Sequence, residues 1–130
     1  MRQTLNNIIS DICVSDQRYN EDAYEFVLEA LSFTQKKFKR SKHVTGRELL
    51  EGIKLLLMDK FGPLAMTVLE HWGIRSTEDF GNIVFNLVSQ QVLSKTEEDN
   101  IESFRDVYDF EKVFQHGYRQ RLHKKISRLR

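Results

Sequence analysis

The sequence contains only one cysteine, Cys13, and only one proline, Pro63, among its 130 residues. A single cysteine excludes an intrachain disulfide and any zinc site built from several thiolates. Cys13 follows Ile12 on a segment with helical apolar spacing, which is typical of a buried structural thiol rather than a nucleophile. We therefore predict a reducing, cytoplasmic setting.

Long hydrophobic runs are also missing, and the longest uninterrupted block covers residues 55–58. A transmembrane helix needs ~20 apolar residues, so no membrane span is expected. Residues 1–16 lack the apolar stretch and the small-residue cleavage site of a signal peptide. The sequence predicts a soluble protein that is not exported by the common route.

The motifs of the common catalytic classes are absent as well. There is no Walker A loop, no dinucleotide-binding glycine pattern and no nucleophile elbow. His116 and His123 would lie ~10 Å apart along a helix, too far to share a metal ion. The acidic residues 97–99 lack the alternating ligands and central glycine of a calcium loop. We expect no metal, no cofactor, no small-molecule substrate and no enzymatic activity, although residues distant in sequence can still assemble a site.

Charge is strongly segregated, although the formal net charge is only +1. Residues 1–35 carry 2 basic and 6 acidic side chains, a net charge of −4, and residues 36–47 carry 6 basic and none acidic, a net charge of +6. Residues 48–112 carry 6 basic and 13 acidic side chains, a net charge of −7, and residues 113–130 carry 6 basic and none acidic, a net charge of +6. Such blocks determine which partners a protein attracts more than the net value does.

Apolar residues recur at helical spacing in five successive segments. Asn20 is a plausible N-cap, Thr45 and Glu48 have the form of a capping box, and Ser76 or Thr77 can start the fifth segment. Gly62 suits the end of a helix and Pro63 the start of the next. The expected helices cover residues 4–14, 20–38, 45–61, 63–72 and 76–88.

The segments after the fifth helix have strand length. Residues 92–96, VLSKT, and residues 103–110, SFRDVYDF, flank a polar turn. Two helices joined by a short glycine-containing turn and followed by a hairpin is the order of a winged helix-turn-helix. We predict a mainly α fold, with a winged helix-turn-helix-like unit, additional N- and C-terminal helices and a short β-hairpin wing. Residues 1–114 would form this single domain, and residues 115–130 a basic amphipathic C-terminal helix or tail.

Five blocks of sequence, taken in order, carry a resemblance to a known family. They are AYEFVLEAL, TGRELLEGI, FGPLAMTVLEHWGI, TEDFGNIVFNLV and LSKTEED. Over residues 18–114 the chain resembles an uncharacterised bacterial family of conserved hypothetical proteins. The resemblance implies no catalytic or binding residues.

The helix expected over residues 76–88, which would be the third helix of the winged unit, is unlike a DNA-reading helix. Residues 76–94 contain no lysine or arginine, and Glu78 and Asp79 would face the polyanion. We therefore favour a non-catalytic protein-interaction or regulatory module that binds a protein partner or another copy of itself. The residues expected to face the partner are Asn82, Asn86, Gln90, Glu97, Glu98 and Asp99.

The alternative is a nucleic-acid-binding protein that holds the phosphate backbone through residues 36–47 and 119–130. The candidate contacts are Lys36, Lys37, Lys39, Arg40, Lys42, Arg47, Arg119, Arg121, Lys124, Lys125, Arg128 and Arg130. The C-terminal cations also suit an anionic membrane surface, but large apolar anchor residues are missing there. An acidic body and a basic tail in one chain also favour head-to-tail self-association.

Overall fold

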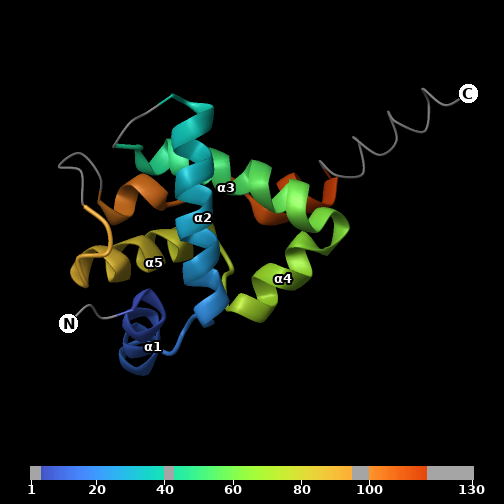
Figure 1. The fold of residues 1–130 in the computed structure, drawn as a ribbon. Coiled ribbons are helices and arrows are strands. Elements are labelled where there is room, and N and C mark those ends of the chain that lie inside the picture. The colour runs from blue at the N-terminus through green and yellow to red at the C-terminus, as the bar shows by residue number, and fades with distance from the viewer. Residues whose placement is uncertain (1–3, 40–42, 95–99, 117–130) are drawn as a thin grey trace, which may run out of the picture.

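The computed structural model describes residues 4–39, 43–94 and 100–116, and over these residues it is built from helices and the segments that join them (Figure 1). The helices are α1 (Leu5–Ser15), α2 (Glu21–Lys37), α3 (Gly46–Phe61), α4 (Ala65–Trp72) and α5 (Thr77–Ser89), with the short 3-10 helices η1 (Gly62–Leu64) and η2 (Ile101–Phe104) and the π-helix η3 (Glu111–His116). The mainly α prediction is confirmed. Among these described helices, none has both the length and the apolar character of a bilayer span.

Local sequence signals place most of the helix starts. Asn20 caps α2 by accepting a hydrogen bond from the Asp22 N–H at 2.8 Å. Thr45 and Glu48 form the predicted capping box at the start of α3, with bonds of 3.1 and 3.0 Å. These side chains satisfy backbone N–H groups that the first turn of a helix leaves without partners. Gly62, with a φ of 48°, ends α3 as predicted.

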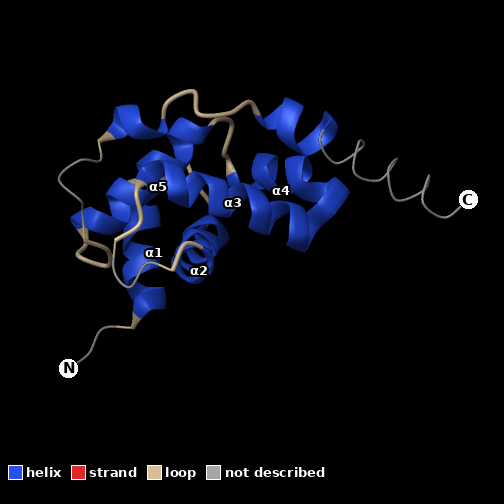
Figure 2. Ribbon diagram, turned by 90° about the horizontal axis from the view of Figure 1, so that it is seen from above, coloured by secondary structure: helices blue, strands red, loops and turns tan. Residues whose placement is uncertain are grey.

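The predicted β-hairpin wing is wrong. Where the structure describes the segment after α5, it forms turns and then η2, and none of these residues is in a strand (Figure 2). The Phe104 ring packs against Gly81, where an added Cβ would lie 2.7 Å from the Cβ of Phe104. The Thr77 hydroxyl donates to the Phe104 carbonyl at 2.6 Å. The segment is therefore anchored by one buried ring and by hydrogen bonds to α5, so it does not pair as a strand, and the winged-helix interpretation no longer applies.

The most extensive helix contact is between α2 and α3. The two helices cross where Thr34 of α2 meets Gly52 of α3, and both residues are buried. A Cβ at position 52 would overlap the Thr34 hydroxyl oxygen. That oxygen also donates to the Ala30 carbonyl at 2.6 Å. The absence of a side chain at Gly52 is what allows α2 and α3 to approach this closely.

Helices α2, α3 and α4 form three sides of a triangle (Figure 1). α3 leads away from its crossing with α2, η1 turns the chain, and α4 returns to the start of α2, where the Asn20 N–H donates to the Trp72 carbonyl at 3.2 Å. η3 packs against α4 and η1, and Figure 2 shows it on the side of α3 away from α2. Phe110 and Phe114, immediately before η3 and within it, are buried here. Residues 117–130 of the expected C-terminal helix or tail lie outside the described residues, so the boundary at residue 114 stays a prediction.

We predict that Gly52→Ala destabilises the protein by about 1–3 kcal/mol, because the added methyl group overpacks the crossing. Alanine otherwise stabilises a helix interior by ~1 kcal/mol relative to glycine, so the sign of the effect is informative. Urea unfolding followed by circular dichroism measures it. The double variant Thr34→Ala/Gly52→Ala should be less destabilised than Gly52→Ala alone. A stabilised Gly52→Ala variant would contradict the close approach.

Candidate functional site

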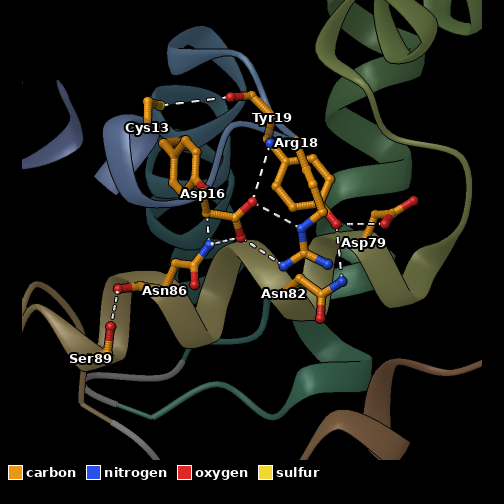
Figure 3. A network of polar contacts seen from close by, with 9 residues as sticks. Cys13, Asp16, Arg18, Tyr19, Asp79, Asn82, Asn86 and Ser89 are labelled. Atoms are coloured by element: carbon orange, nitrogen blue, oxygen red, sulfur yellow. Dashed lines mark hydrogen bonds and ion pairs between the residues drawn. The ribbon is translucent and has the colours of Figure 1, made fainter. Parts of the chain in front are cut away.

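Polar side chains between α1 and α2 form a network with α5 (Figure 3). The carboxylate of Asp16 accepts from Arg18 Nε at 2.9 Å, from the terminal guanidinium nitrogen at 2.7 Å and from the Arg18 backbone N–H at 3.1 Å. This two-pronged pairing holds the loop in one conformation. The hydrogen bonds from Arg18 hold the pKa of Asp16 well below its ordinary value, and burial opposes this shift only in part.

The amides of Asn82 and Asn86 belong to the same network. Asn86 Nδ2 donates to Asp16 and to the Tyr24 hydroxyl, each at 3.0 Å. Asn82 Nδ2 donates to the Tyr19 hydroxyl at 2.9 Å. Both side chains are therefore partly buried against the loop before α2 and α2 itself, and their amides satisfy hydroxyl groups inside the chain. Their expected role in facing a partner stays a prediction. Gln90 is exposed just beyond α5.

The remaining partner-facing residues, Glu97, Glu98 and Asp99, lie outside the described part of the chain. Their role, like that of Gln90, stays a prediction.

Tyr19 is buried and links the loop to the start of α5. Its hydroxyl donates to Asp79 Oδ1 at 2.5 Å, and the other carboxylate oxygen of Asp79 accepts from the Arg75 and Ser76 N–H groups at 2.8 and 3.2 Å. Burial, with the hydrogen bond to Asp79, raises the pKa of Tyr19. Burial also raises the pKa of the Cys13 thiol, whose sulfur donates to the Tyr19 carbonyl at 3.6 Å. The network therefore holds a neutral phenol and a neutral thiol, and neither is activated as a nucleophile.

A second feature is a groove between α2, the end of α3 and α4, with a volume of about 550 Å³. Three aromatic rings form its floor. The Phe26 ring centroid lies 5.1 Å from that of Trp72, the Phe61 centroid lies 5.8 Å from Trp72, and Phe26 and Phe61 are 6.1 Å apart. Thr67 and Val68 of α4 complete the wall. The groove is open to solvent above an aromatic floor, which suits an apolar side chain from outside.

One edge of the groove is acidic. Asp22, Glu25 and Glu29 line it from α2 at positions i, i+3 and i+7, which places them along one edge of that helix. Lys60 pairs with Glu29, with Nζ 2.9 Å from Oε1, and His71 lines the groove from α4. Three carboxylates against one lysine leave this edge with a net negative charge. We call Asp22, Glu25 and Glu29 the acidic edge.

Sequence reasoning missed this groove. The available signal was the i, i+3, i+7 spacing of acids beside the apolar stripe of residues 20–38. The other walls come from α3 and α4, and their position relative to α2 is not a local property of the sequence.

The basic residues expected to bind nucleic acid are only partly described. Lys36, Lys37 and Lys39 are exposed at the end of α2, and Arg47 is exposed in the first turn of α3. The other eight lie outside the described residues: Arg40, Lys42, Arg119, Arg121, Lys124, Lys125, Arg128 and Arg130. Whether all twelve share one face is therefore untested, and nucleic-acid binding stays a prediction.

Metal ligands are not grouped in the part of the chain that the structure covers: no three His, Cys, Asp or Glu side chains there lie close enough to hold an ion. No protein-family model matches the chain, and no curated protein or solved structure matches it either. The resemblance to a bacterial family therefore stays a prediction.

We predict that Asn86→Ala lowers the free energy of unfolding by about 1–3 kcal/mol, because the buried Tyr24 hydroxyl and the Asp16 carboxylate both lose a donor. Gln90→Ala, four residues further on at an exposed position, should change it by less than about 0.5 kcal/mol. Urea unfolding measures both variants. Equal effects would show that the amide of Asn86 contributes no more than a surface side chain.

We also predict that the stabilisation due to Asp16 depends on pH. Because folding lowers the pKa of Asp16, its contribution is complete above the unfolded pKa of about 3.9 and is lost as the pH falls towards the folded value. The difference in unfolding free energy between the wild-type protein and Asp16→Asn should be largest near neutral pH and should shrink below about pH 4. Unfolding curves at several pH values measure it. A difference that grows on acidification would contradict this assignment.

Proposed function

We propose that the protein is a non-catalytic interaction module whose groove binds an amphipathic helix with cationic flanks. The observation that carries the proposal is the acidic edge beside the aromatic floor of Phe26, Phe61 and Trp72. An apolar stripe on a partner helix would contact the rings, and flanking lysine or arginine side chains would contact the carboxylates. This is the helix-in-groove mode of peptide recognition.

The electrostatics of the edge support a cationic partner. Glu25 is exposed, and within the described residues no ion pair joins it to a cation, so it is available to an incoming charge. Glu29 is already paired with Lys60, and its carboxylate would also accept a contact from a cation of the partner. Charges at the rim of an interface mainly affect the association rate and specificity, whereas the apolar contacts at its centre provide most of the affinity.

The polar network supports a structural rather than a catalytic assignment for the other side of the molecule. Each buried side-chain nitrogen and oxygen in the described residues has a hydrogen-bond partner within the chain. A catalytic acid or base needs a free position for the reacting group. The Asp16, Tyr19, Tyr24 and Asn86 side chains instead direct their bonds at one another or at neighbouring residues.

Trp72 allows a direct test, because it is the only tryptophan in the chain and lies in the groove. The probe is a designed peptide of roughly 18 residues, made of leucine and lysine with leucine at helical spacing. Titrating it into the protein should shift the Trp72 emission saturably, and Glu25→Lys/Glu29→Lys should weaken the apparent affinity about three- to tenfold, in line with two rim charges.

Two controls make this test specific. A peptide of the same composition with scrambled leucine positions should shift the emission much less, and so should a leucine–glutamate peptide with the original spacing. An unchanged Trp72 spectrum, or equal responses to the ordered and scrambled peptides, would overturn the proposed function.

A further inference from the structure

We propose that the helix bound in the groove is residues 117–130 of a second copy of this chain, so that the protein associates with itself. This inference rests on the proposed function, because it names the partner of the same groove. Three features of the chain support it: the chemistry of residues 117–130, the spacing of their charges, and the position of η3 relative to the groove.

Residues 117–130, GYRQRLHKKISRLR, have the chemistry that the groove selects. Their sequence predicts one apolar helical face, and the segment carries six basic side chains and no acidic one. The apolar positions are Tyr118, Leu122, Ile126 and Leu129. No other stretch of the sequence of this length has such a high positive charge combined with a helical apolar stripe.

The spacing of the charges also matches. Asp22, Glu25 and Glu29 follow one another at intervals of three and four residues along α2. Arg121, Lys124 and Arg128 repeat these intervals. On two helices lying side by side, both sets extend over roughly 10 Å. Three cations can therefore face the three acids without distortion of either helix, while the apolar stripe faces the rings.

The position of η3 favours a second copy over the same molecule. η3 ends at His116 and packs against α4 and η1, and it lies on the side of α3 away from α2, whereas the acidic edge belongs to α2 (Figure 2). As a helix, residues 117–130 would span roughly 21 Å. Their apolar stripe starts at Tyr118, so only Gly117 would be left to lead around α3 or α4 to the groove of the same molecule. A neighbouring molecule is free of this restriction.

Such a contact joins two different surfaces, so it builds either a reciprocal dimer or a longer head-to-tail series. Sedimentation velocity on the full chain over a range of concentrations distinguishes both from a monomer. We expect the mean mass to rise with protein concentration and to fall with added salt, because part of the attraction is between exposed charges.

Charge-reversal variants of the full chain test the pairing. Glu25→Lys/Glu29→Lys and Lys124→Glu/Arg128→Glu should each raise the dissociation constant of self-association about tenfold. Combining all four substitutions restores opposite charges across the contact and should restore association to within about threefold of the wild-type value. Asp59→Lys/Glu70→Lys changes the net charge equally at exposed positions outside the groove, and it should have little effect. Circular dichroism checks that each variant is folded.

A synthetic peptide of residues 117–130, titrated while Trp72 emission is followed, separates the failure of this inference from the failure of the proposed function. Binding of this peptide, with weaker binding of its Lys124→Glu/Arg128→Glu form, is the expected result. If the leucine–lysine peptide binds and this peptide does not, the groove has another partner and the inference is overturned while the proposed function stands. If neither peptide binds, both fail. Two further results would contradict the proposal that a second copy is the partner. One is a full chain that stays monomeric although the peptide binds, and the other is a variant with all four substitutions that does not regain association.

Discussion

The close contact between Thr34 and Gly52 is the constraint on which the rest of the structure depends. It fixes where α2 and α3 cross, and therefore how far the end of α3 stands from α2. Gly62, with its positive φ, then turns the chain so that α4 closes the triangle against the start of α2. The groove is the space that remains between three helices whose positions are set by this crossing. Its aromatic floor is continuous with the core, since Phe26 and Trp72 line the groove and also belong to the buried core cluster.

Helix α5 is joined to α2 and to the loop before it through side-chain hydrogen bonds, rather than through a close contact between backbones. Asn82 and Asn86 of α5 supply donors to Tyr19, Tyr24 and Asp16, so α5 cannot shift along α2 without leaving buried hydroxyl groups unsatisfied. The molecule therefore has a rigid polar side and an open aromatic side with an acidic edge. This division explains why most of the conspicuous polar residues are structural, whereas the proposed binding surface is built from residues that resemble ordinary core and helix-surface positions.

Features controlled by neighbouring residues were predictable from the sequence. Asn20 and the Thr45–Glu48 pair start their helices as expected because capping depends on backbone groups two or three residues away. The wing was not predictable, since a short apolar segment becomes a strand or a 3-10 turn according to what it packs against, and Phe104 packs against Gly81 of α5. The internal hydrogen bonds of Asn82 and Asn86 were not predictable for the same reason: the loop and the helix that accept them come from the far end of the chain. The groove lies between three helices, and no local sequence pattern predicts how these helices pack against one another.

The hydrogen bond between Asn86 and Tyr24 has a consequence for the order in which the protein can fold as it is synthesised. The two residues are 62 positions apart, and the Tyr24 side chain is fully buried in the finished structure. When α1 and α2 leave the ribosome, the donor for this hydroxyl has not yet been translated. The Tyr24 hydroxyl therefore gains its final partner only after α5 has emerged, so the packing of α2 is completed together with α5 rather than helix by helix.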